Sequence, residues 1–181
     1  MKKIKGFTLV EVLLSAAVIS ILVLASFSVL EVGQGAWFSG DVHAELRKEI
    51  IRAFMAMERE LSPTRPAQQS VPFGESRTAI TFKIPQDSND ADTTILDSFG
   101  YIEWSGNISY ALDGSNQIIR TDPAGATQVL ARYMTSLQFS RFRNNPALPQ
   151  DLLIINLTAQ KTSSVGKVAS ETGQLIIRMR N

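Results

Sequence analysis

The chain has 181 residues, enough for one folded domain of roughly 150 residues and one further segment. Its 18 basic and 17 acidic side chains give a formal net charge of +1, which excludes the strongly basic surface of a typical nucleic-acid-binding protein. We therefore expect no direct nucleic-acid partner. There is no cysteine, so an exported domain would depend on its hydrophobic core without disulfides.

An apolar run extends from Phe7 to Leu30 and is interrupted by a single charge, Glu11. About 20 such residues suffice to cross a bilayer as a helix, the only single segment that satisfies its own backbone in lipid. Three lysines precede the run: Lys2, Lys3 and Lys5. The positive-inside rule therefore keeps the N-terminus in the cytoplasm and exports the rest of the chain.

The start of the run does not fit an ordinary secretory signal. Such a signal has an apolar region of about 7–15 residues, with the cleavage site after it. Here the run is longer, and the small residue Gly6 lies before it. A charge in a membrane helix needs a partner, and a cut after Gly6 would create one for Glu11, the amine of Phe7. The alternative is an uncleaved signal anchor in which Glu11 is protonated or reaches the cytoplasmic interface, since it lies only about 6 Å along the helix from Phe7.

The segment Gly6-Phe-Thr-Leu-Val-Glu11 resembles the processing site of type IV prepilins and type II secretion pseudopilins. The resemblance implies that a prepilin peptidase cuts after Gly6 and methylates the new amine of Phe7. It implies that the membrane helices pack as a filament core in which Glu11 pairs with the amine of a neighbouring subunit. A carboxylate and an ammonium attract strongly in a site of low dielectric constant. The leader residues that the peptidase would recognise are Lys2, Lys3 and Lys5.

The same resemblance implies the function, the partners and the location. The chain is expected to be a minor pilin or pseudopilin, a subunit at or near the tip of a type IV pilus or a type II secretion pseudopilus. Its partners would be the prepilin peptidase, the inner-membrane assembly platform, the major subunit and other minor subunits. It would cross the inner membrane once, with a periplasmic C-terminal domain that lies outside the cell once in a filament. The alternative is a permanently anchored periplasmic binding or scaffold domain.

Helical periodicity resumes after Gly33 and Gly35, which are expected to loosen the helix. Apolar residues recur at steps of three or four and form one stripe. A stripe of so few turns is more typical of a helix that packs on its own domain than of a coiled-coil stalk. Pro63 and Pro66 are expected to end the helix. The stripe consists of Val42, Leu46, Ile50, Phe54, Met57 and Leu61.

Beyond Ser76 the apolar pattern takes the two-residue period of strands. An α+β, pilin-like fold is therefore expected, with a long N-terminal helix packed on an antiparallel β-sheet domain. The segment from Thr162 to Gly173 is polar and is expected to be a loop. The predicted strands are 79–84, 101–104, 108–112, 117–120, 137–142, 152–158 and 175–179. The predicted parts of the chain are a leader (1–6), a membrane and filament-core helix (7–30), an amphipathic helix (31–62) and an exported β domain (63–181).

The β half also resembles J-type minor pseudopilins and W-type minor pilins, through the order of its strands. The chain has Ser28 where many major pilins carry a helix-kinking proline. It has Glu11, which the pseudopilin that caps the filament tip typically lacks. The resemblance therefore implies a place just below the tip.

Other candidate sites are weaker. The cluster from Asp87 to Asp92 departs from the EF-hand pattern and is expected to be a solvated loop. His43 is the only histidine, and no nucleophile motif or Gly-rich phosphate loop is present. We therefore expect no enzyme activity, cofactor or metal site. Trp37 and Phe38 are expected to be interfacial anchors, and Trp104 to lie in the core of the sheet.

Overall fold

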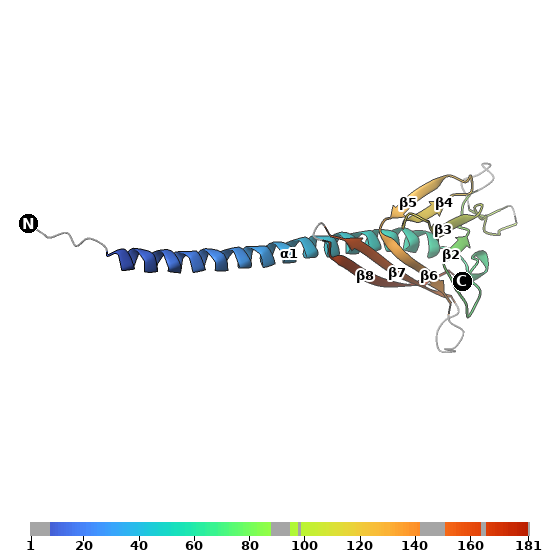
Figure 1. Cartoon of the computed structure of the whole chain (residues 1–181). Coiled ribbons are helices and arrows are strands. Elements are labelled where there is room, and N and C mark those ends of the chain that lie inside the picture. The colour runs from blue at the N-terminus through green and yellow to red at the C-terminus, as the bar shows by residue number, and fades with distance from the viewer. Residues whose placement is uncertain (1–7, 88–94, 98, 142–150, 164–165, 181) are drawn as a thin grey trace, which may run out of the picture. The chain divides into compact units, whose positions relative to one another are not determined.

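The structure, a computed structural model, describes residues 8–87, 95–97, 99–141, 151–163 and 166–180 (Figure 1). The chain forms two compact units, Met1–Asp41 and Val42–Asn181; the second is called the C-terminal domain. One long helix is followed by a short 3₁₀ turn and eight strands, the expected α+β arrangement. The elements are α1 (Leu9–Leu61), η1 (Pro66–Gln68), β1 (Ser76–Arg77), β2 (Ala79–Phe82), β3 (Ile108–Leu112), β4 (Ile118–Thr121), β5 (Thr127–Ala131), β6 (Met134–Ser140), β7 (Leu152–Thr162) and β8 (Val168–Arg178).

In the first unit, α1 exposes apolar side chains all round. Leu9 is 78% exposed, and Trp37, beyond the apolar run, is also 78% exposed. Helix α1 continues through Gly33 and Gly35, so the glycines do not interrupt it. By length and composition α1 is able to cross a membrane. A helix that is apolar on every side is typical of a membrane span or of the core of a bundle.

In the C-terminal domain, the second half of α1 buries the predicted apolar stripe. Five of the six predicted residues are buried, and the sixth, Phe54, is partly buried against the same core. Ala53, which the prediction omitted, is fully buried. The helix ends at Leu61, ahead of Pro63 and Pro66, as predicted. The prediction that this stripe packs on its own domain is confirmed.

The strands form two antiparallel sheets rather than one. The first has the order β1-β6-β7-β8 and the second the order β2-β3-β4-β5. Figure 1 shows both sets of strands gathered around the part of α1 that belongs to the C-terminal domain. This part of α1 and both sheets contribute side chains to one hydrophobic core. Examples are Met57 of α1, Tyr110 of β3 and Leu153 of β7. The chain passes from one sheet to the other between β1 and β2, which Thr78 alone separates.

Three predictions for the β half were wrong. The segment Thr162 to Gly173 is not a loop throughout, because β8 begins at Val168. Strand β5 was missed altogether. Residues 101–104 form only isolated bridges, and Trp104 is half-buried outside the core. The failures share a cause: these segments bury one face or less, so they lack the continuous apolar pattern that identifies an interior strand.

Candidate functional site: the start of the membrane helix

Reciprocal hydrogen bonds between Thr8 and Glu11 cap the N-terminus of α1. The backbone N–H of Thr8 donates to Oε2 of Glu11 at 2.9 Å, and the Thr8 hydroxyl donates to the same oxygen at 3.1 Å. In return, the backbone N–H of Glu11 donates to Oγ1 of Thr8 at 3.3 Å. This is a capping box, in which Thr8 is the N-cap residue and Glu11 the third helical residue. Two backbone N–H groups that have no partner within the helix are thereby satisfied.

The capping box does not neutralise the charge of Glu11. Its donors are a backbone amide and a hydroxyl of Thr8, and both are electrically neutral. Across the part of the chain that the structure describes, no basic side chain forms an ion pair with Glu11. The positive end of the helix dipole favours a carboxylate at this position. Glu11 is therefore held in place within its own chain while its charge stays available to a cation from elsewhere.

The hydroxyl groups farther along the apolar run are satisfied internally. Each donates to the carbonyl oxygen four residues earlier, at 2.8 Å for Ser15, Ser20 and Ser26 and at 3.1 Å for Ser28. Such bonds remove the cost of leaving a hydroxyl group unpaired in lipid. Glu11 is thus the one charged side chain of the run from Thr8 to Leu30, and its hydrogen-bond donors in the structure are the neutral groups of Thr8.

The predicted site residues are divided between described and undescribed parts of the chain. Gly6, Phe7 and the leader lysines Lys2, Lys3 and Lys5 lie outside the described residues. Their predicted roles in cleavage, methylation and recognition stay predictions, as does the role of Glu11 in assembly. The capping role of Thr8 was not predicted. The pattern Thr-x-x-Glu directly before an apolar run is a capping-box signal and was available in the sequence.

In the C-terminal domain, polar side chains of α1 bond to a carboxylate on β8. Nδ1 of His43, on α1, lies 2.9 Å from Oε1 of Glu171 on β8. The same oxygen accepts a hydrogen bond from Nε of Arg47 at 3.1 Å. Among the described residues, no group of three or more His, Asp or Glu side chains converges as a metal site. Of the Asp87–Asp92 loop the structure describes only Asp87.

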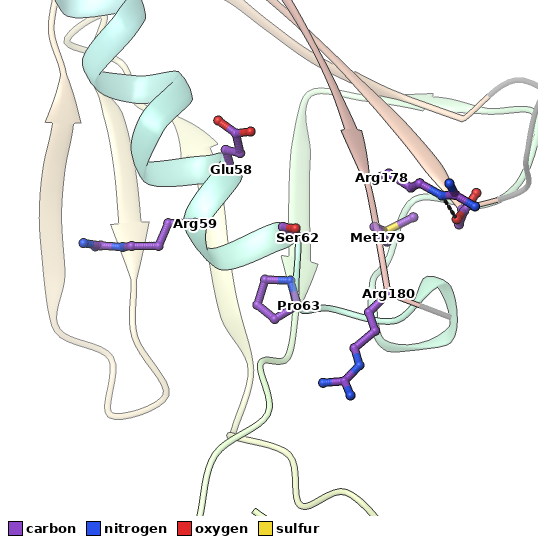
Figure 2. A pocket seen from close by; sticks show the side chains of 8 residues that line it. Glu58, Arg59, Ser62, Pro63, Arg178, Met179 and Arg180 are labelled. Atoms are coloured by element: carbon purple, nitrogen blue, oxygen red, sulfur yellow. Dashed lines mark hydrogen bonds and ion pairs between the residues drawn. The ribbon is translucent and has the colours of Figure 1, made fainter.

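A pocket of about 830 Å³ lies where α1 and β8 end (Figure 2). In the close-up, the side chain of Arg59 extends away from β8, and that of Arg180 extends away from Arg178. Nε of Arg178 donates to Oδ2 of Asp151 at 2.8 Å, and this hydrogen bond lowers the pKa of the Asp151 carboxyl. Asp151 and Arg178, both in the lining, thus form an ion pair with each other. The lining of the pocket is Glu58, Arg59, Ser62, Pro63, Asp151, Arg178, Met179 and Arg180.

Comparison with protein families identifies the start of the chain. Residues 1–27 match the model of the prokaryotic N-terminal methylation motif, so the chain carries the type IV prepilin-like signal. This motif implies processing by prepilin peptidase and assembly among pilin-like subunits in general. With the apolar helix, it indicates a membrane-anchored, single-pass precursor of the pilin and pseudopilin type. No curated protein and no solved structure matches the chain.

Proposed function

We propose that the mature chain is a minor pilin or pseudopilin, assembled into or near the tip of a type IV pilus or a type II secretion pseudopilus. The observation that carries this proposal is Glu11, a lone carboxylate in a membrane-length apolar run, within the methylation motif that residues 1–27 match. Cleavage after Gly6 would place a new ammonium group at Phe7, four residues before Glu11. The proposed orientation has the N-terminus in the cytoplasm and the C-terminal domain in the periplasm, because three lysines precede the helix.

The capping box supports a specific assembly step. Before assembly, Thr8 holds the Glu11 carboxylate at the N-terminus of α1 through neutral donors. When subunits pack, the amine of a neighbouring Phe7 would approach this carboxylate and supply the missing positive charge. The attraction is stronger in the low dielectric of packed helices than in water. Because the carboxylate is already oriented, less conformational freedom is lost when the pair forms.

The C-terminal domain would supply the surface that distinguishes this subunit from its neighbours. Its core forms without any disulfide, from both sheets and the second half of α1. We also propose that the chain is not an enzyme and needs no cofactor, as the sequence contains one histidine and no cysteine. Its activity would lie in assembly alone.

Substitution of Glu11 tests the proposal. Glu11→Ala should leave leader cleavage intact and abolish recovery of the subunit with sheared filaments or pseudopili. The matched control is Glu31→Ala, which removes an exposed carboxylate from the same helix just beyond the apolar run. That control should assemble like the wild type. If Glu11→Ala assembles normally, or if Glu31→Ala fails equally, the assigned role of Glu11 is wrong.

A further inference from the structure

Strand β8 presents the longest free edge in the C-terminal domain. Its eleven residues pair with β7 in unbroken register from Leu152↔Arg178 to Thr162↔Val168. The other strands at the edges of the two sheets, β1, β2 and β5, have two, four and five residues. On the side of β8 away from β7, no backbone hydrogen bond joins it to another described residue. The outward-facing amides and carbonyls of β8 therefore form a ready template for a further strand.

Apart from one inward-facing carboxylate, Glu171, this edge lacks the usual features that prevent strand pairing. Natural edge strands are commonly interrupted by bulges or carry proline or outward lysines. Strand β8 contains no proline, lysine or bulge. Its charged residues are Glu171, which pairs with His43 and Arg47, and Arg178, which pairs with Asp151. Between its ends, the exposed face carries only uncharged side chains, the polar Ser170, Thr172 and Gln174 and the apolar Ile176.

Two exposed apolar side chains of α1 lie within one helical turn of the residues that contact β8. Glu171 of β8 bonds to Arg47 of α1, and a Cβ added at Gly173 would lie 2.8 Å from Cε2 of Phe54. Ile51 lies one helical turn from both Arg47 and Phe54 and is 56% exposed. Met55, one turn after Ile51, is 67% exposed. A strand added to β8 would cover these two side chains with its inward face.

We propose that the free edge of β8 binds an extended segment of another polypeptide, which adds to the sheet as a fifth strand. The exposed apolar side chains of Ile51 and Met55 require apolar residues at alternate positions of that segment. The outer face of β8, which is uncharged between its ends, favours uncharged residues at the positions between them. Backbone hydrogen bonds would supply affinity and the alternating side chains specificity, as in other cases of strand addition. The proposal concerns the C-terminal domain alone and would stand if the filament role failed.

Amide hydrogen exchange of the full chain in detergent micelles tests this site. The probe is a synthetic peptide as long as β8, with alternating valine and threonine, N-methylated at its threonines so that it pairs along one edge only. At a peptide concentration about ten times its dissociation constant, the outward amides of β8 should exchange about tenfold more slowly. The amides of β5, the free edge of the second sheet, should be unaffected.

Two double variants, each of which introduces two lysines, distinguish peptide binding at the edge of β8 from binding on the face of the sheet. Ser170→Lys with Gln174→Lys adds two charges to β8 and should abolish the protection. Asn156→Lys with Gln160→Lys adds the same charges to the directly paired positions of β7 and should preserve it, although both variants lose the hydrogen bond from Gln174 to Asn156. On α1, Ile51→Gln with Met55→Gln should weaken peptide binding about tenfold, whereas Lys48→Gln should not.

Three results would overturn the proposal. The first is that the peptide leaves exchange in β8 unchanged in the wild type. The second is that both lysine pairs reduce protection equally, because the face of the sheet would then be responsible. The third is that β8 becomes protected without peptide as the protein concentration rises, because the occupant would then be a second copy of this chain.

Discussion

Tyr110 connects the second sheet to the end of α1 through a buried polar contact. The side chain is fully buried, and its hydroxyl donates to Oε2 of Glu60 at 2.5 Å. Nε of Arg120 donates to both oxygens of Glu60 at 3.0 Å. A hydrogen bond to a charged group contributes about 1.5–3 kcal/mol to stability. Because Arg120 still pairs with Glu60 in the Tyr110→Phe variant, we expect a loss near the lower end, about 1.5 kcal/mol.

The pH dependence of this loss identifies the hydroxyl as its source. Burial, and then the hydrogen bond to Glu60, raises the pKa of Tyr110. In the unfolded chain Tyr110 loses its proton above about pH 10, whereas in the folded chain it keeps it. Its contribution is therefore complete below about pH 10 and falls by about 1.4 kcal/mol per pH unit above that. The gap in stability between the wild type and Tyr110→Phe should narrow at that rate.

Urea unfolding of the full chain in a mild detergent, followed by far-ultraviolet circular dichroism, measures both effects. The control is Tyr101→Phe, since Tyr101 is 71% exposed, and its free energy of unfolding should stay within about 0.5 kcal/mol of the wild type. The reasoning is refuted if the gap for Tyr110→Phe is constant between about pH 9 and pH 11. It is also refuted if the control loses as much stability.

Two further predictions concern β8 and its neighbours. Gly173→Ala should lower the free energy of unfolding by about 1–3 kcal/mol, because the new Cβ would lie 2.8 Å from both Cγ2 of Ile50 and Cε2 of Phe54. The control is Gly114→Ala, because a Cβ at Gly114 would have no atom within 4 Å. Equal thermal midpoints for the two variants would contradict the close packing at Gly173. The hydrogen bond from Arg178 lowers the pKa of Asp151, so its stabilising effect is present above the ordinary carboxyl pKa and is lost as the pH falls. Thermal midpoints of the wild type and Arg178→Met should therefore differ at neutral pH and converge below about pH 4, and a difference that persists in acid would disprove the linkage.

Local patterns in the sequence were sufficient to predict α1. The stripe from Val42 to Leu61 repeats with the helical period, and Pro63 marks its end, so each feature is set by residues within a few turns. The ion pair between Glu45 and Lys161 joins residues that lie 116 positions apart, so local patterns could not predict it. The division into two sheets depends on similarly distant pairings, and alternation within one strand does not specify its neighbour.

Strand β8 shows why a polar segment can be misread. Its outward residues Ser170, Thr172 and Gln174 are typical of a loop in composition. Its inward residues include Glu171, whose charge is paired, and Gly173, whose missing side chain makes room for Phe54. Glutamate and glycine both have a low intrinsic preference for strands. Here the tertiary contacts of Glu171 and Gly173 with α1 outweigh that preference.

The prepilin-like signal at the start of the chain could be predicted from local features of the sequence. A leader, a cleavage residue and a carboxylate at fixed spacing are local features, and the methylation motif at residues 1–27 agrees with them. The capping role of Thr8 is also local, since it lies three residues before Glu11 and bonds to it. The proposed cation for Glu11 belongs to another subunit, so neither the sequence nor the structure of one chain contains it.

The intact mass and N-terminal sequence of the chain purified from membranes of a prepilin-peptidase-positive host test the central claim most directly. Processing at the motif predicts a mature chain that lacks Met1 to Gly6 and begins with Phe7 carrying one N-methyl group. A chain that retains its leader and begins with Met1 would contradict the account and leave a permanently anchored protein in its place.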